Sequence, residues 1–290
     1  MTGIIDIGSN TIRLVTFDRR RQISNVSVNS EIIADTENRL LTPSGIEKLC
    51  DAVKFLKERA GDMPVYAFAT YAVRILKNCG EVHDAVLEKT GVDIDILSGV
   101  REAEYDFYGL KSYIHKNASG IGIDLGGGSA QIMLFRYGEP EFLNSYPIGC
   151  RRIKNEMVRG KFPDAAEKSK INEYVKSHIG RKGHKGKLYM MGGTAKKAAK
   201  IYSFLFGSEN ANMLKTENLP RLIEFIEQTP AEIMKKVMQN RYDNIVVGIV
   251  IMQAIAECYN KSKIYIKKCG VRDGYLMKIC EELQENAQTT

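Results

Sequence analysis

One hydrophobic pattern occurs twice in the chain. Residues 4–17 (IIDIGSNTIRLVTF) and residues 121–135 (IGIDLGGGSAQIMLF) each run from an apolar stretch through an aspartate and a glycine-rich turn into a second apolar stretch. Alternating apolar positions predict β-strands, and a short glycine turn between two strands predicts a hairpin. When the segments are aligned on their aspartates, the matching pairs are Asp6 with Asp124, Gly8 with Gly126, Leu14 with Ile132, and Phe17 with Phe135. We infer a duplicated structural unit.

Helical and strand patterns alternate along the rest of the chain. Helical periodicity and capping signals predict helices over residues 42–61, 79–91, 101–116, 147–160, 165–180 and 275–286, and two further helices within 217–260. Short apolar runs predict strands at residues 23–33, 65–70, 92–98 and 263–268, and residues 188–207 are typical of a strand, a glycine turn and a helix. This alternation predicts an α/β fold.

The duplication suggests two domains that face each other across a cleft. We expect the boundary at Asn117–Gly120, just before the second hairpin, which gives domains of residues 1–117 and 118–290. The last helix is expected to pack back on the first domain. Ligand sites favour such interfaces between domains.

Composition narrows the class of protein. The chain has 290 residues and a formal net charge of +7, which favours anionic partners but also fits a merely basic soluble protein. Its six cysteines form no C-x-x-C pair, which is unlike a zinc site or a dense disulfide framework. The longest apolar run, residues 245–256, is too short to span a bilayer. We therefore expect a soluble cytoplasmic protein with free thiols and no membrane partner.

An aspartate beside a glycine turn is suited to phosphate chemistry. Glycine lets backbone N–H groups approach a phosphate closely, and a neighbouring carboxylate can hold Mg²⁺. The alternative is an ordinary hairpin turn, in which glycine is common, although the paired occurrence makes that interpretation weaker. Neither segment is a P-loop or a dinucleotide-binding G-x-G-x-x-G unit.

Seven segments together resemble one protein family. They are DIGSNTIRL, ATYAVRILKN, SGVREAEYDFYGL, DLGGGSAQ, YPIGCRR, MGGTAKKAAK and CGVRDGYL. Their order and spacing resemble the exopolyphosphatase / guanosine pentaphosphate phosphohydrolase family, in its short form without an extra C-terminal helical domain. That resemblance implies the fold of the actin, chaperone and sugar-kinase superfamily, with two ribonuclease-H-like domains.

The resemblance assigns roles to individual residues. Glu102 matches the family's essential glutamate and is expected to be the base that activates water, with Arg74 as a second catalytic residue. The alternatives are a helix N-terminal acid for Glu102 and a surface arginine for Arg74. The expected metal ligands are Asp124, Asp6 and Gln131, and the expected phosphate-binding residues are Gly8, Ser9, Asn10, Arg13, Gly126, Gly127, Gly128, Ser129, Gly193, Thr194 and Arg272.

The chain departs from the family pattern at several of these positions. Gln131 stands where the family usually has a glutamate, and glutamine is a poorer Mg²⁺ ligand than a carboxylate. Tyr71 stands where the family usually has serine. Arg101 replaces an acid and is expected to place positive charge beside Glu102.

The expected function is Mg²⁺-dependent release of terminal phosphate from inorganic polyphosphate, with Mn²⁺ as the alternative metal. Two other functions stay open: hydrolysis of guanosine pentaphosphate or a nucleoside triphosphate, and a sensor with little turnover, which Gln131 favours. By resemblance alone we expect a homodimer. The basic segments 151–154 and 181–187 either guide a polyanion or are solvated loops, and no aromatic platform that would indicate nucleic-acid binding alternates with them.

Overall fold

The computed structural model describes residues 1–9, 11–19, 21–29, 32, 35–180, 183–207, 212–230, 232–234 and 244–289, with side chains up to residue 282. By its contacts the chain divides into two compact units. Unit 1 comprises Met1–Glu102 and Arg272–Thr290, and unit 2 comprises Ala103–Val271. Each of the two boundaries between the units falls inside a helix. The domain boundary expected near residue 117 was placed by the start of the second hairpin, whereas the two units are defined by contacts. That boundary stays a prediction.

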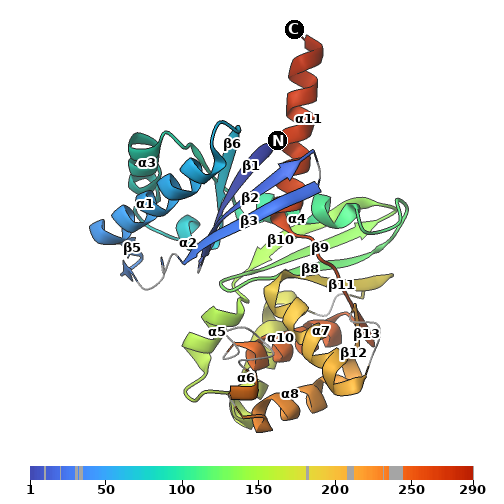
Figure 1. Ribbon diagram of the computed structural model, residues 1–290. Coiled ribbons are helices and arrows are strands. Elements are labelled where there is room, and N and C mark those ends of the chain that lie inside the picture. Colours follow the sequence, from blue (N-terminus) through green and yellow to red (C-terminus); the bar gives the residue numbers. More distant parts are fainter. Residues whose placement is uncertain are drawn as a thin grey trace. The chain divides into compact units, whose positions relative to one another are not determined.

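Unit 1 is built on a mixed five-stranded sheet with strand order β3-β2-β1-β6-β7 (Figure 1). Its strands are β1 (Thr2–Ile7), β2 (Thr11–Asp18), β3 (Arg21–Asn29), β6 (Val65–Ala69) and β7 (Ile94–Ile96). The first three strands form an antiparallel meander, and β6 and β7 then add in parallel to β1. A separate short hairpin consists of β4 (Thr36–Glu37) and β5 (Leu40–Leu41).

The helices of unit 1 follow the signals in the sequence. Helix α1 (Pro43–Ala60) begins after Thr42, whose side chain accepts a hydrogen bond from the Gly45 N–H, and it ends at Gly61. Helix α3 (Cys79–Thr90) ends at Gly91 in the left-handed conformation. The apolar faces of α1 and α3 pack with β1, β2 and β6 in one core. The sequence did not predict the short helix α2 (Tyr71–Arg74).

Two helices cross between the units. Helix α4 (Gly99–Lys111) begins in unit 1 and continues in unit 2, and helix α11 (Val271–Thr289) has all but its first residue in unit 1. Within unit 1, the Tyr275 ring of α11 lies 4.8 Å from the Phe68 ring of β6, measured between centroids. Within unit 1 the last helix thus packs on the sheet.

Unit 2 is built on a mixed six-stranded sheet with strand order β10-β9-β8-β11-β13-β12. Its strands are β8 (Gly120–Leu125), β9 (Ala130–Arg136), β10 (Glu139–Tyr146), β11 (Lys187–Met191), β12 (Met213–Lys215) and β13 (Lys263–Ile266). An antiparallel meander again comes first, followed by parallel strands β11 and β13, and β12 closes one edge in antiparallel pairing.

Among the described residues, five helices cover one face of this sheet: α5 (Cys150–Met157), α6 (Ala165–Ile179), α7 (Gly192–Phe206), α8 (Leu219–Gln228) and α10 (Ile245–Cys258) (Figure 1). A short 3₁₀ turn, η1 (Thr216–Asn218), precedes α8. The apolar run at 245–256 forms α10, which is buried along nearly its whole length, so its hydrophobicity serves the core. No helix in the described part of the chain is both long and apolar enough to cross a membrane.

The duplicated sequence pattern corresponds to a duplicated topology. In each unit an antiparallel three-strand meander carries the aspartate on its first strand, and parallel strands follow. This is the strand arrangement expected of two ribonuclease-H-like domains, so the predicted α/β class is confirmed.

Candidate phosphate-binding and catalytic residues

The two glycine turns close in the same way. The Gly8 N–H donates to the Thr11 carbonyl at 3.1 Å, and the Gly126 N–H donates to the Ser129 carbonyl at 3.0 Å. The aspartates occupy equivalent register positions, since Asp6 pairs with Arg13 across the first hairpin and Asp124 pairs with Gln131 across the second. The structure thus builds one local device twice. Asn10, predicted in the first turn, lies outside the described residues.

The backbone carbonyls of the second turn accept hydrogen bonds from the start of helix α5. The Gly126 carbonyl accepts from the Cys150 N–H, and the Gly127 carbonyl accepts from the N–H groups of Arg151 and Arg152. The turn therefore satisfies the otherwise unbonded N–H groups at the start of α5. This contact is so close that a Cβ on Gly149 would lie 2.2–2.4 Å from backbone atoms of the turn.

The N–H groups of the same turn are left for a ligand. Within the described residues, the backbone N–H groups of Gly127, Gly128 and Ser129 donate no hydrogen bond. Ser129 is 4% exposed, and its hydroxyl oxygen lies 3.0 Å from the Gln131 amide nitrogen. A run of unused N–H groups is the arrangement that binds a phosphate oxygen.

Helix α7 brings its N-terminus to Asp124. A Cβ on Gly192 would lie 2.6 Å from Asp124 Oδ1 and 2.6 Å from the Leu125 carbonyl oxygen, so only glycine fits there. Gly192 also has φ +91°, which disfavours other residues. Gly193 and Thr194 follow in the first turn of α7, which has no side-chain cap. Helix N-termini favour anions, so unit 2 groups a carboxylate, a glycine turn and a helix N-terminus.

Thr194 connects this helix with α5. Its hydroxyl lies 3.4 Å from Cys150 Sγ, and burial raises the pKa of the Cys150 thiol to about 11. Cys150 is therefore a neutral packing group at neutral pH and is not a nucleophile.

Gln131 is engaged in the sheet. Its side chain is 2% exposed, and its amide nitrogen donates to the hydroxyls of Ser129 and Ser145, each at 3.0 Å. These contacts hold the amide beside the glycine turn. Its predicted role as a metal ligand stays a prediction.

A second carboxylate, not predicted from the sequence, lies beside Asp124. Asp106 is fully buried on α4, and a Cβ on Gly270 would lie 3.7 Å from Asp106 Oδ1 and 3.5 Å from Asp124 Oδ2. Gly270 thus leaves a space that both carboxylates border. The signal was present in the sequence, since Asp106 falls within the apolar helical stripe of Ala103, Phe107 and Leu110.

In unit 1 the structure brings together both predicted catalytic residues. Arg74 Nη1 lies 2.8 Å from Glu102 Oε2 and also donates to the Leu97 carbonyl at 2.7 Å. The side chains are only 20% and 10% exposed, respectively. Glu102 lies in the first turn of α4, and its N–H donates to the Ser98 carbonyl. A fixed, largely buried carboxylate is suited to orienting a water molecule.

Arg101, next to Glu102 in the sequence, is paired with an aspartate. Its guanidinium makes two hydrogen bonds of 2.8 Å with the carboxylate of Asp95 on β7. Glu102 is bonded to Arg74, which reaches it from α2. The expected positive charge of Arg101 beside Glu102 stays a prediction. Tyr71, in place of the family's serine, lies with its ring 6.0 Å from the Arg74 guanidinium carbon and so supports that arginine.

The remaining predicted residues of unit 1 lie around its own turn. Arg272 Nε is 3.5 Å from Asp6 Oδ2, so the first aspartate has a cation beside it. Arg13 is half-buried on β2 opposite Asp6, and Ser9 is half-buried in the turn.

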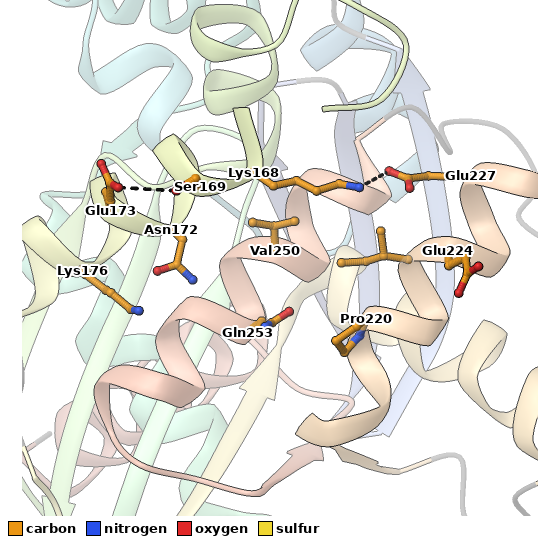
Figure 2. Close-up of a pocket in the computed structure, with 11 residues that line it drawn as sticks. Lys168, Ser169, Asn172, Glu173, Lys176, Pro220, Glu224, Glu227, Val250 and Gln253 are labelled. Atoms are coloured by element: carbon orange, nitrogen blue, oxygen red, sulfur yellow. Dashed lines mark hydrogen bonds and ion pairs between the residues drawn. The ribbon is translucent and has the colours of Figure 1, made fainter. Parts of the chain in front are cut away.

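Two cavities within the units are lined by other residues. A groove of about 630 Å³ between α6, α8 and α10 has two lysines and three glutamates on its rim (Figure 2). Lys168 is paired there with Glu227, and Lys176 is paired with Glu257 just beyond the groove. A cavity of about 750 Å³ in unit 1 is lined by residues that include His83, Asp93 and Asp95. Neither contains a predicted site residue. Across the described residues, no three His, Cys, Asp or Glu side chains form a ready metal cage.

Comparison with known proteins identifies the family. The family model described as the Ppx/GppA phosphatase family matches residues 15–283. The chain belongs to the Ppx/GppA phosphatase family. The expectation of a phosphate-hydrolysing enzyme is thereby confirmed at the level of this family.

Individual relatives agree with membership of the Ppx/GppA family. Exopolyphosphatase 1 of Mycobacterium leprae is 24% identical over 95% of this chain and 88% of its own length. A crystal structure of an exopolyphosphatase from Cytophaga hutchinsonii superposes with a TM-score of 0.84 at 18% identity, covering 97% of this chain and 98% of that one. A crystal structure of the Aquifex aeolicus member of the Ppx/GppA family superposes with a TM-score of 0.81 at 21% identity, covering 98% of each chain. At these identities the structures support the fold.

Proposed function

We propose that this Ppx/GppA phosphatase is an exopolyphosphatase, which hydrolyses the terminal phosphate from inorganic polyphosphate. The observation that carries the proposal is the second glycine turn. Its N–H groups at Gly127, Gly128 and Ser129 are not used within the described residues, and Asp124 and the N-terminus of α7 lie beside them. This arrangement has donors for several oxygens of one phosphoryl group.

In this proposal Glu102 acts as the general base. A water molecule held by its carboxylate attacks the terminal phosphorus, and the bond between that phosphorus and the bridging oxygen breaks. The bridging oxygen keeps the electron pair and becomes the end of the shortened chain, while the water proton passes to Glu102. Arg74 is a positioning residue, because its contact with Glu102 at 2.8 Å fixes the carboxylate orientation.

The residues of unit 2 fit a divalent cation. Asp124 and Asp106 supply carboxylate oxygens next to the space that Gly270 leaves open, and Mg²⁺ is bound in proteins by one or two carboxylates together with water and phosphate oxygens. Asp124 and Asp106 would hold Mg²⁺ or Mn²⁺ there, and the metal would neutralise phosphate charge. The family resemblance implies two further ligands, which are Asp6 in the first hairpin and Gln131 in the second.

The test is phosphate release by the purified protein in the presence of Mg²⁺. The substrates are long-chain polyphosphate, tripolyphosphate, guanosine pentaphosphate and ATP. We expect polyphosphate to be the best substrate, and we expect Glu102→Gln to reduce the rate by about 10²–10⁴-fold, the usual contribution of a general base. Glu104→Gln is the matched control, because Glu104 is a half-buried neighbour on the same helix.

Other outcomes of this experiment would contradict the proposal. Faster release from guanosine pentaphosphate than from polyphosphate would make the chain a nucleotide phosphohydrolase. Binding of polyphosphate without release from any substrate would make it a sensor. Equal loss of activity in Glu104→Gln and Glu102→Gln would remove Glu102 from the role of base.

A further inference from the structure

The sheet of unit 2 has a basic face beyond helix α4. Leu188 and Met190 on β11 and Ile264 on β13 point into the helical core, so the alternate residues of these strands lie on the opposite face. Helix α4 packs on part of that face with Phe107 and Leu110. We call the uncovered part of this face the lysine–tyrosine face. It comprises residues of β11, β12 and β13, and the residue that follows β13: Lys187, Tyr189, Lys215, Lys263, Tyr265 and Lys267.

Two lysines of this face are held crosswise over two tyrosine rings. Lys187 Nζ lies 5.0 Å from the Tyr265 ring centroid, and Lys267 Nζ lies 5.6 Å from the Tyr189 ring centroid. The two rings are neighbours in register, with centroids 6.0 Å apart. Cation–π contact restrains ammonium groups that would otherwise be mobile, so less side-chain entropy is lost when they bind an anion.

The lysines also form a row across the strands. Lys215 on β12 is the register partner of Lys263 on β13, and Lys187 begins the adjacent strand β11. Neighbouring strands are about 4.8 Å apart, so the row places positive charges at short, regular intervals. Among the described residues, Lys187, Lys263 and Lys267 pair with no carboxylate, and Lys215 has Glu217 at 3.6 Å.

We propose that the lysine–tyrosine face binds inorganic polyphosphate, as a second contact for a long chain outside the catalytic residues. The inference rests on the proposed function, because polyphosphate is its substrate. A row of ammonium groups complements a linear chain in which each phosphate unit is charged. A nucleic acid is disfavoured because base stacking requires open rings, whereas Tyr189 is 8% exposed and lysines lie over both rings.

The experiment compares two charge-reversed variants. Lys187→Glu/Lys263→Glu alters the face, and Lys170→Glu/Lys200→Glu makes the same change of net charge at exposed positions of α6 and α7, on the other side of the sheet. Binding of long-chain polyphosphate is measured by titration at several salt concentrations. Phosphate release from tripolyphosphate, the shortest polyphosphate substrate used, is measured in parallel. Lys187→Gln/Lys263→Gln replaces the first variant if that variant does not fold.

The expected result is specific to the face. The dissociation constant for long polyphosphate should rise about tenfold or more in Lys187→Glu/Lys263→Glu, and its log–log salt dependence should become shallower by about two, because two phosphate contacts are lost. Release from tripolyphosphate should not change.

Two results would overturn the inference: equal weakening in the control variant, or a single-stranded oligonucleotide of equal charge that binds the same lysines as tightly as polyphosphate. Absence of phosphate release by the wild-type protein would instead remove the proposed function, while the binding comparison would still decide whether the face binds a polyanion.

Discussion

Arg74 Nη1 lies 2.8 Å from Glu102 Oε2, although the two residues come from different helices. The same arginine nitrogen donates to the Leu97 carbonyl just before α4, so Arg74 fixes both the carboxylate and the backbone that leads to it. The pair is mostly buried, which makes it more than a solvated surface contact.

Arg74→Ala should lower kcat by about a hundredfold, because a small misplacement of a catalytic group can cost that much. KM for polyphosphate should change far less, and Arg74→Lys should restore part of the rate by replacing the charge without the second hydrogen bond. Steady-state kinetics test this. Arg101→Ala is the control, since Arg101 is the sequence neighbour of Glu102 but pairs with Asp95. A rise in KM with unchanged kcat would show that Arg74 binds substrate and does not position the base.

Gly192→Ala should reduce the free energy of unfolding by about 3 kcal/mol, because it combines an unfavourable backbone conformation with an overpacked contact. Its Cβ would lie 2.6 Å from Asp124 Oδ1, at a residue with φ +91°. Gly193→Ala is the matched control, since nothing lies within 4 Å of its Cβ position. It should change stability by less than about 0.5 kcal/mol, as exposed helical substitutions usually do. Urea unfolding of the two variants measures the difference, and similar stabilities would contradict the described approach of α7 to Asp124.

Asp106→Asn should weaken divalent cation binding by at least about ten- to a hundredfold, because the loss of an outer-shell partner of a metal ligand already costs that much. Mn²⁺ binding followed by electron paramagnetic resonance without substrate gives a readout independent of turnover. Gln131→Glu should increase the affinity, because it adds a carboxylate in register with Asp124. Asp95→Asn is the control, since Asp95 pairs with Arg101 in unit 1. Unchanged Mn²⁺ affinity in Asp106→Asn would exclude Asp106 as a ligand.

His83 should make stability depend on pH. Its ring nitrogens lie 3.0 Å from Asp84 Oδ1 and 2.9 Å from Asp93 Oδ1. The hydrogen bond with Asp84 is the largest cause that raises the pKa of His83, and the hydrogen bond with Asp93 is the next. Because the pKa is higher in the folded state, the stabilisation is fully present below the unfolded pKa of about 6.5 and is lost as pH rises through the folded value. Urea unfolding of the wild-type protein and His83→Gln should therefore differ most at pH 5.5–6 and converge at pH 8–9. A difference that grows with pH would show the opposite sign and contradict the assignment.

The sequence predicted the local elements well where several signals agreed. Helix α1 has a threonine cap, apolar helical spacing and a terminal glycine, and it begins and ends where these predict. The edge strands β10 and β12 and the helix α2 were missed, because half-exposed edge strands and four-residue helices have little periodicity of their own. Pairing with a neighbour decides whether such segments form.

By itself, the sequence determined the duplicated hairpins, the α/β class and the residue types for phosphate chemistry, because these depend on local patterns a few residues long. Only the tertiary structure decided which side chains meet. It paired Glu102 with Arg74 and Arg101 with Asp95, and it brought Asp106 beside Asp124 from a different element. It also joined lysines of three strands into one face. These contacts depend on strand order and helix packing, which bring together residues that are distant along the chain.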